Sequence, residues 1–423
     1  MTSSTPWASL FTEPLAAAAS DIAALIERQR RQNAESINLV ASESYCPRAT
    51  LEAEASLLVN KNASGYPPRI SFAGGEIMDE IENLAIARAR RLFGAEHANV
   101  QSLSSTISNV AVLRALLKPG DRILAFDSVT GGHSSHGSPR HVSGQDYTVE
   151  SFGVDATTGL IDYAAAHAHA RAFRPRMIIA GSTAYPRQID FIRLQEIATD
   201  TGALLFADIA HVAGLVIAGL HPNPVLHCDV ATTSTHKPFC GPRTGGLILS
   251  KARYAQAIDA ALAPGVQAAP GGHIIAARAV LFELVQRPAF RELMQAVVAD
   301  AAALARGLAA GGLALYAGGT ETHMVVVDLR GTPWQAAELN GGLERHGIIA
   351  NTTTLQRRAG DRSSLGLRLG STPMTIRGLD QQGFAIVAQC VSALITRESS
   401  ASIDTAIQRQ MRELALAHPV PFE

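Results

Sequence analysis

The stretches ALLFADIAHVAG (203–214) and DVATTSTHKPFCGPRTGG (229–246) indicate the fold of this chain. Each begins with a short apolar run of the kind expected of a strand that is buried on both faces. Asp208 ends the first run, and Lys237 follows the second in a loop rich in serine, threonine and glycine. Because open α/β sheets bind ligands outside the carboxyl ends of their strands, we expect a carboxylate and an amine at one sheet edge.

Around these stretches, apolar runs that predict strands alternate with segments of helical periodicity. The predicted strands include ANVQSL (98–103), RILAFD (122–127), RMIIAGS (176–182) and GGLILS (245–250), and the predicted helices include SNVAVLRALL (108–117) and IRLQEIATDTG (192–202). Such alternation predicts a mostly parallel sheet with helices on both faces.

The remaining sequence predicts an N-terminal arm and a second domain. One helix is expected over 21–35, with Ile22, Leu25 and Ile26 at helical spacing, and another over 80–94, closed by Gly94 as a C-cap. The later elements are a helical stretch of roughly 272–311, the segments MVVVDL, IIANTTT and LGLRLGS, and a tail helix near 403–417. We predict an N-terminal arm and helix (1–60), a large domain (61–290) and a small C-terminal α/β domain (291–423).

The composition is typical of a soluble globular protein. Of the 423 residues 47% are hydrophobic and 17% charged, and the formal net charge is −1 without any basic run, which disfavours nucleic acid or an anionic membrane as partner. The four cysteines form no C-x-x-C pair, which argues against zinc or a disulfide framework and favours a reducing compartment. We read no signal peptide and no apolar run of about 18 residues, and therefore expect a cytoplasmic protein without a membrane segment or a bound metal.

Lysine is scarce, and only Lys61, Lys118, Lys237 and Lys251 are present. An isolated lysine is usually a solvated surface group, but Lys237 directly follows an apolar strand in a context that suits such a group poorly. Pyridoxal 5′-phosphate (PLP) requires a lysine that forms an imine and an acid that keeps the pyridine nitrogen protonated. Lys237 and Asp208 are therefore candidates for that pair.

A run of hydroxyl residues precedes a predicted helix in the same part of the chain. Ser104, Ser105 and Thr106 lie directly before the helical segment that begins near residue 108. One serine suffices as an N-cap, whereas phosphate groups bind where backbone N–H groups and hydroxyls meet at a helix N-terminus. Three consecutive hydroxyls therefore favour an anion site.

Longer motifs resemble the serine hydroxymethyltransferase family of fold-type I PLP enzymes over nearly the whole chain. The matching motifs are NLVASES (38–44), GGEIMDEIENLA (74–85), ANVQ (98–101), GGHSSHGSP (131–139), DIAHVAGLVIAGLHPNPV (208–225), STHKPFCGPRTGG (234–246) and LRLGSTP (367–373). The resemblance implies an aspartate aminotransferase-like fold with a mostly parallel, seven-stranded sheet in the large domain. It also implies PLP as cofactor.

The resemblance also implies roles for individual residues. Lys237 would form the Schiff base and Asp208 would pair with the pyridine nitrogen. His133 would stack on the coenzyme ring, and His211 would lie near its phenolic oxygen and the substrate. These four are the predicted catalytic residues, and the other implied cofactor-binding residues are Ser104, Ser105, Thr106, Thr183 and His236. His136, in the same motif as His133, is interpreted equally well as a structural loop histidine.

Substrate-binding residues follow from the same resemblance. Arg368 would bind the substrate carboxylate in a bidentate manner, with Ser42 beside it. Arg243 would have a conformational or electrostatic role near the lysine. Asn62, Ser64 and Phe72 occupy positions that contact substrate in the family.

The chain departs from the family pattern at the folate pocket. Family members carry a tyrosine and, two residues on, a glutamate before the Gly-Tyr-Pro triplet, where this chain has Asn62 and Ser64. Further departures are Ser71 and Phe72 at a pair of tyrosines, Ser128 and Ser134 at leucines of the folate slot, and an extra residue after Gly370. A hydroxyl cannot shuttle protons as a carboxylate can, and the lost apolar walls remove surface that a pterin would bury. Folate independence is therefore predicted, although a register shift around 62–72 would make Glu76 a compensating acid.

Several reactions share the retained machinery. The leading hypothesis is aldolase or transaldolase chemistry, through a quinonoid, on a β-hydroxy-α-amino acid of the threonine/glycine type in specialised metabolism. The polar lining suits a hydrophilic or nucleoside-like aldehyde. The alternatives are an oxygen-dependent PLP monooxygenase or oxidative decarboxylase of a glycyl-type amino acid, and a true glycine/serine or α-methylserine hydroxymethyltransferase. A non-enzymatic PLP-binding scaffold is the weakest, because Lys237, Asp208 and Arg368 all remain.

The resemblance further implies an obligate homodimer or a dimer of dimers. Two chains of this family share each active site. The segments 62–72 and 263–272 would reach the cofactor of the neighbouring chain, while the substrate would be a small amino acid.

Overall fold

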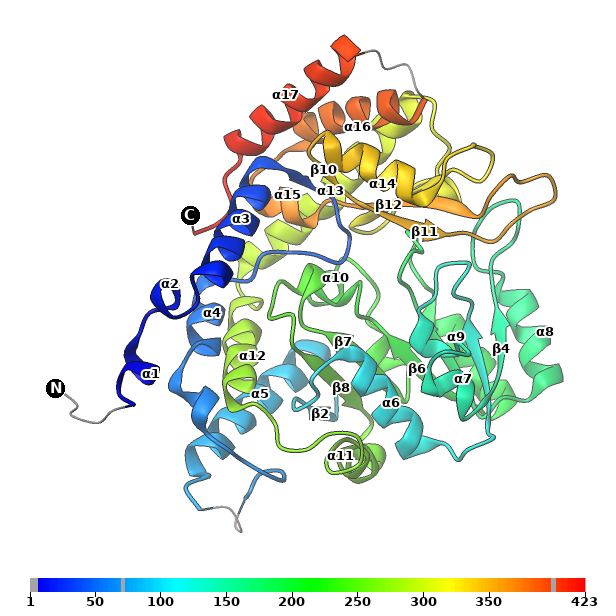
Figure 1. Ribbon diagram of the computed structural model, residues 1–423. Coiled ribbons are helices and arrows are strands. Elements are labelled where there is room, and N and C mark those ends of the chain that lie inside the picture. The colour runs from blue at the N-terminus through cyan, green and yellow to red at the C-terminus, as the bar shows by residue number, and fades with distance from the viewer. Residues whose placement is uncertain (1–6, 70–72, 397–400, 423) are drawn as a thin grey trace.

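The computed structural model describes residues 7–69, 73–396 and 401–422, and its centre is a seven-stranded sheet (Figure 1). In spatial order the strands are β2 (His97–Asn99), β8 (Gly246–Ser250), β7 (Val230–Ser234), β6 (Leu204–Asp208), β5 (Met177–Gly181), β3 (Arg122–Phe126) and β4 (Thr148–Phe152). β8 pairs antiparallel with both neighbours and the other pairs are parallel. The prediction of a mostly parallel, seven-stranded sheet is confirmed.

Successive residues of each strand enter different cores, because side chains alternate between the two faces of a sheet. Ile123 and Ala125 of β3 lie in a core that also includes side chains of α6 and α11. Leu124 and Phe126 lie in a second core on the opposite face, which α5, α8, α9 and α12 cover. The helices and short 3-10 turns (η) of this part are α4 (Arg48–Glu54), η1 (Leu57–Asn60), α5 (Glu76–Phe93), α6 (Ser105–Leu116), η2 (Ser134–His136), α7 (Val142–Gln145), α8 (Tyr163–Phe173), α9 (Phe191–Thr201), α10 (Ala213–Ile217), η3 (Pro224–Leu226), η4 (Lys237–Phe239), η5 (Ala252–Tyr254), α11 (Ala255–Leu262) and α12 (Gly272–Leu284).

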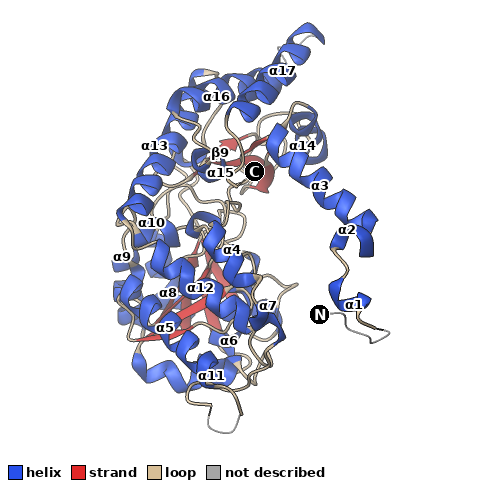
Figure 2. Cartoon of the chain, turned by 90° about the vertical axis from the view of Figure 1, so that its left-hand side faces the viewer, coloured by secondary structure: helices blue, strands red, loops and turns tan. Residues whose placement is uncertain are grey.

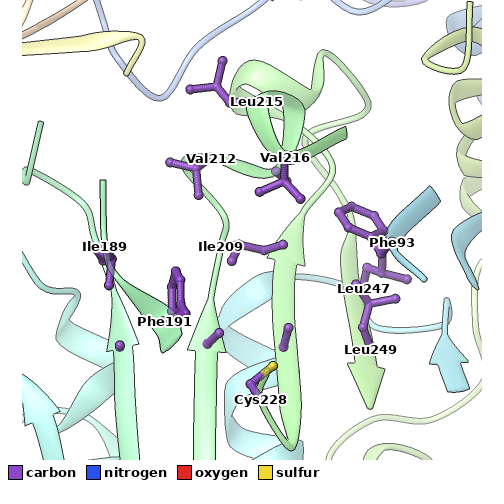
Figure 3. Close-up of a cluster of buried hydrophobic side chains, with 14 of the residues drawn as sticks. Phe93, Ile189, Phe191, Ile209, Val212, Leu215, Val216, Cys228, Leu247 and Leu249 are labelled. Carbon is purple, nitrogen blue, oxygen red and sulfur yellow. The ribbon is translucent and has the colours of Figure 1, made fainter. Parts of the chain in front are cut away.

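The second of these cores reaches the carboxyl ends of the central strands. Figure 3 shows Ile209 and Val212, which follow β6, near Val216 of α10 and Leu247 of β8. All of these side chains are at least nine-tenths buried. The segment that leaves β6 is therefore held by apolar packing of Ile209 and Val212.

Two predicted elements differ in extent from the structure. The strand predicted over 98–103 ends at Asn99, because the side-chain oxygen of Asn99 accepts the N–H of Gln101 (2.9 Å) and removes it from the ladder. The helical stretch predicted over 272–311 is two helices, α12 and α13 (Pro288–Ala310), because a proline ring clashes inside a helix and is tolerated in its first turn. The predicted C-cap at Gly94 is confirmed, with φ of 69°.

A smaller unit is formed mostly by the C-terminal part of the chain. Its elements are β9 (Met324–Asp328), β11 (Asn351–Thr354) and β12 (Leu365–Gly370) in an antiparallel sheet, the pair β1 (Ile37–Asn38) and β10 (Ile348–Ile349), and α13, η6 (Tyr316–Gly318), α14 (Ala336–Arg345), α15 (Thr372–Ile376), α16 (Gln381–Thr396) and α17 (Ala401–Ala417). Ile37 and Leu39 belong to its core, so the N-terminal segment packs with C-terminal elements. The division at residues 60 and 290 stays a prediction.

α13 is the one helix in the described ranges that is long and apolar enough to cross a membrane by length and composition. Met294 and Val297 of this helix are fully buried in the core of the large sheet, and Leu304 and Leu308 in the core of the small unit. Such packing is typical of a core helix that joins two parts of a globular fold.

The N-terminal helices lie apart from the large sheet. α1 (Ser9–Thr12) and α2 (Leu15–Ala18) project from the body of the chain in both views, and α3 (Ser20–Glu35) leads back to β1 (Figures 1 and 2). Ile22, Leu25 and Ile26, which predicted this helix, are each about half exposed. Their apolar face is therefore available to another chain.

Arg377 joins the C-terminal ends of α3 and α17. This side chain, 5% exposed, donates to the carbonyl oxygens of Asn33, Ala34, Ser36, Ala415 and His418 at 2.6–3.0 Å. These carbonyls belong to the last turns of α3 and α17, where helices have unpaired acceptors and the negative end of the dipole. One guanidinium thus satisfies both helix ends.

We predict that Arg377→Leu lowers the free energy of unfolding by roughly 3 kcal/mol, because several buried carbonyls lose a charged donor. Urea denaturation measures this change, and hydrogen exchange should accelerate over residues 33–36 and 415–418. Arg409→Leu, on the exposed face of α17, is the control and should change stability by less than about 0.5 kcal/mol. Equal effects of the two substitutions would contradict the role of Arg377.

Candidate active site

A cavity of about 260 Å³ lies at the carboxyl ends of β5, β6 and β7. Gly181, Asp208 and Thr232 are aligned in the register of these strands. The cavity is lined by Ser104, Ser105, Thr106, His133, Ser182, Thr183, Asp208, Ala210, His211, Ser234, His236, Lys237 and Arg243. The structure therefore brings together all of the predicted catalytic and cofactor-binding residues.

Lys237 extends into this cavity from the turn after β7. It has a φ of 64°, which is unusual for a residue with a side chain and costs about 1 kcal/mol. Backbone hydrogen bonds on either side hold the turn, from Thr235 to Gly245 and from Cys240 to Lys237. Burial lowers the pKa of Lys237 to about 8; Asp208 opposes this shift, and the charges of Arg368 and Arg243 add to it. The amine is therefore partly unprotonated near neutral pH and can attack an aldehyde.

The carboxylate of Asp208 is buried within a set of hydrogen-bond donors. Its Oδ2 accepts from Asn109 Nδ2 at 2.8 Å and lies 3.0 Å from His136 Nε2, while Oδ1 accepts from the N–H of Ala210 at 3.1 Å. Because His136 Nδ1 accepts the N–H of His133 (3.4 Å), its Nε2 carries the proton that is donated to Asp208. Burial alone would raise the pKa of Asp208, but the hydrogen bond and electrostatic attraction of His136, with contributions from His133 and Asn109, hold it well below its usual range.

The sequence did not identify the supporting roles of Asn109 and His136. Asn109 is oriented by Thr232, whose hydroxyl donates to its side-chain oxygen at 2.6 Å. Its position four residues after Ser105 places both on one face of α6, which is a signal that could have pointed to the cavity. The contact of His136 with Asp208 favours a supporting role at the cavity over a purely structural role in the loop.

Metal binding is a second way to interpret this cluster. His133, His136 and Asp208 each offer a ligand atom, and the three atoms lie within 4.8 Å of one another. Ligation through Nε2 of His136 would require loss of the proton that it donates to Asp208. We therefore interpret the cluster as a hydrogen-bonded network.

The histidines that line the cavity are neutral near pH 7. Nδ1 of His133 accepts the N–H of Ser135 at 3.2 Å, so the neutral ring carries its hydrogen on Nε2 and can donate it to a ligand. Burial lowers the pKa of His133 to about 4 and that of His211 well below its usual value. Burial, with the charges of Lys237 and Arg243, lowers the pKa of His236 to about 3. The rings of His211 and His236 can accept a proton, and none of the three places positive charge beside Lys237 at rest.

The other end of the cavity is suited to an anion. Ser104 is the N-cap of α6, because its Oγ accepts the N–H of Ile107 at 3.1 Å. By contrast, the hydroxyls of Ser105 and Ser234 and Nδ1 of His236 are buried without a hydrogen-bond partner among the residues described. Since buried polar atoms are nearly always paired, these atoms fit a ligand such as a phosphate at the N-terminus of α6.

Arg368 of β12, in the small unit, contacts a residue that lines the cavity. Its Nη1 donates to the carbonyl oxygen of Thr183 at 2.8 Å, and its Nε is buried without a partner in the described part of the chain. Ser42 follows Ala41, and the backbone of Ala41 packs directly against Gly370 at the end of β12. Both residues of the predicted carboxylate site therefore border the junction between the two units.

Those of the predicted folate-pocket residues that the structure describes do not line the cavity. Asn62 and Ser64 are exposed and do not line the cavity, and Ser128 and Ser134 are also exposed. Glu76, the alternative acid, is exposed in the first turn of α5. Ser71 and Phe72 lie outside the described residues.

The pH dependence of coenzyme capture tests Lys237. Because only the unprotonated amine attacks an aldehyde, the rate of covalent capture of added PLP should rise roughly tenfold per pH unit below pH 8 and level off above it. Stopped-flow absorbance measures this rate. Lys251→Ala should retain the profile and Lys237→Ala should abolish covalent capture. A rate that still rises toward pH 10.5, the ordinary value for lysine, would contradict the shifted pKa.

Comparison with protein families agrees with this arrangement. The family model described as serine hydroxymethyltransferase matches residues 15–391, which include every residue that lines the cavity. Enzymes of this family are fold-type I proteins that use PLP and act on small amino acids. The buried lysine, the ionised aspartate and the unpaired anion-binding groups fit that cofactor, and the chain belongs to the serine hydroxymethyltransferase family.

Proposed function

We propose that this enzyme is a folate-independent aldolase or transaldolase. Its substrate would be a β-hydroxy-α-amino acid of the threonine/glycine type. Membership of the family supports PLP-dependent chemistry at the Cα of an amino acid in general. The finer assignment rests on the residues that are retained at the cavity and those that are replaced beside it.

The retained residues suffice to bind and activate an amino acid. Bound PLP withdraws electrons from the Cα of an amino acid that is attached to it. Asp208 keeps the pyridine nitrogen protonated, and Arg368 binds the carboxylate of the substrate. His211 is neutral and can take the proton of the β-hydroxyl group as the Cα–Cβ bond breaks, while the neutral His133 lines the same cavity as a hydrogen-bond donor.

The observation that carries the proposal is the absence of an acid from the segment before α5. Residues 61–75 contain neither aspartate nor glutamate. The described part of this segment is held in place, because the Tyr66 hydroxyl donates to the backbone of Asp259 and Arg69 pairs with Asp79 and Glu82. A carboxylate for folate-dependent transfer would therefore have to come from elsewhere, whereas aldol cleavage needs only the base at the cavity.

The assay with native enzyme follows acetaldehyde release from threonine with and without tetrahydrofolate. We expect release that is independent of tetrahydrofolate and of oxygen, and serine turnover with tetrahydrofolate at least about a hundredfold slower, since a lost acid–base group costs about 10²–10⁴ in rate. Lys237→Ala is the inactive control. Efficient turnover of serine with tetrahydrofolate would instead identify a true hydroxymethyltransferase, and oxygen consumption would identify the oxidative alternative.

We also propose that the enzyme assembles as a homodimer or as a dimer of such dimers. Leu57 and Val59 of η1 and Ile77 of α5 are 86%, 56% and 66% exposed, and they flank the segment that holds Asn62 and Ser64. Large apolar side chains that are this exposed are typical of a protein interface. A second chain on this surface would bury them and bring the 61–69 segment toward the neighbouring cavity.

We predict that the double substitution Leu57→Asp and Val59→Asp converts the assembly to monomers, since it places charge in a buried interface. Light scattering measures the mass, and equilibrium titration with PLP should show weaker coenzyme binding. Ile192→Asp, at an exposed residue of α9, is the control and should leave the mass unchanged. A monomeric native enzyme with full activity would refute the shared site.

A further inference from the structure

His323 lies beneath the active site and contacts three segments that are distant in sequence. Its side chain is 0% exposed and comes directly before β9. Its Nε2 lies 3.0 Å from the carbonyl oxygen of Ala41, and its ring stacks on that of His211 with centroids 5.6 Å apart and planes inclined by 18°. Its own carbonyl oxygen accepts the N–H of Ser371 at 3.0 Å. One residue therefore links the N-terminal segment, the start of α15 and the loop after β6.

The hydrogen bond to Ala41 fixes the protonation of this ring. A carbonyl oxygen can only accept, so Nε2 of His323 carries the hydrogen. Burial lowers the pKa of His323 to about 3; the bond to Ala41 opposes the shift, and the charges of Arg368 and Lys237 add to it. Nδ1 is therefore unprotonated, and it has no hydrogen-bond partner in the described ranges. The ring is neutral and anchored at one nitrogen.

The stack on His323 is the contact that can fix the plane of the His211 ring. His211 lines the cavity, yet its Nδ1 is buried and makes no hydrogen bond with any described residue. Metal-free histidines of active sites are usually oriented by a hydrogen bond at the second nitrogen. Among the residues described, the stacked ring of His323 is the contact that can orient His211 instead of such a hydrogen bond.

The same residue holds the backbone next to Ser42. The carbonyl oxygen of Ala41 accepts from His323, and the N–H of Gly370 donates to the carbonyl oxygen of Leu39 at 2.8 Å. The segment 39–42 is thus fixed between His323 and the strand that carries Arg368. A Cβ at Gly370 would lie 2.4 Å from Cα of Ala41, so the two backbones are in direct contact.

We propose that His323 is a positioning residue with two separable actions: its ring sets the plane of His211, and its Nε2–H bond to Ala41 holds Ser42 in place for the substrate carboxylate. The inference rests on the proposed function only in taking His211 and Ser42 as parts of the site. It adds a residue of the small unit that acts on the cavity without lining it.

Two substitutions separate these actions. His323→Gln retains a donor that can reach Ala41 and removes the ring; His323→Phe retains a ring and removes the donor. With PLP-loaded protein, His323→Gln should change the absorbance of the bound coenzyme and lower kcat for threonine about tenfold, with the Kd for glycine within about twofold of native. His323→Phe should keep the absorbance and raise the Kd for glycine about tenfold, as expected for a lost buried hydrogen bond.

His346→Gln is the matched control. His346 is also a buried histidine, 8% exposed, which bonds a backbone oxygen (Gly342, 2.7 Å) in the small unit away from the cavity. This substitution should leave the coenzyme absorbance and the glycine Kd unchanged. The proposal is overturned if both His323 variants retain native absorbance and glycine affinity, or if both lose the two properties to the same extent.

If the variants do not fold, a measurement on the native protein tests the proposal. In protein with labelled histidine rings, NMR should show two histidine rings in mutual contact, one of them neutral with hydrogen on Nε2 from pH 5 to 8. Titration of that ring within this range would overturn the proposal. If the variants separate as expected but native enzyme does not cleave threonine, the proposed reaction fails and the positioning role stands.

Discussion

The buried carboxylate of Asp208 is the constraint on which this active site depends. An ionised acid at the end of a strand with both faces covered is costly unless donors surround it. His136 and Asn109 supply these donors, and each is in turn oriented by a further hydrogen bond. Gly181 on the neighbouring strand has no side chain, and a Cβ there would lie 2.7 Å from that of Asp208. The charge of Asp208 therefore depends on three parts of the fold. The loop after β3 supplies His136, α6 supplies Asn109, and the strand register places Gly181 beside Asp208.

Charge at this position also affects Lys237. Burial favours the neutral amine, and two arginines add to that effect, while Asp208 partly offsets it. The result is an amine that titrates near physiological pH opposite an acid that stays ionised. The surrounding histidines are neutral at rest, so proton-accepting groups lie next to the lysine without repelling it.

The site is completed across the boundary between the two units. Arg368 belongs to β12 and donates a hydrogen bond to the loop after β5. His323 comes directly before β9, and its ring stacks on that of His211. Arg377, farther along the chain, holds the ends of α3 and α17, so the N-terminal segment that carries Ser42 is anchored at a distance. The segment that carries Ser42 is in this way connected to the packing of α3 against α17.

The sequence by itself determined the alternation of elements, the cap at Gly94, the placement of Lys237 and Asp208 at one sheet edge, and an anion site at the hydroxyl triplet, because these depend on local patterns and on a general rule for parallel sheets. Long motifs added the family and its cofactor. Only the tertiary structure decided that Ser104 caps a helix while Ser105 remains unpaired, that His136 supports Asp208, and that His323 supports His211. The physical reason is that such roles depend on which side chains meet: Asn109 and Asp208 are 99 residues apart, and His323 and Ala41 are 282 apart.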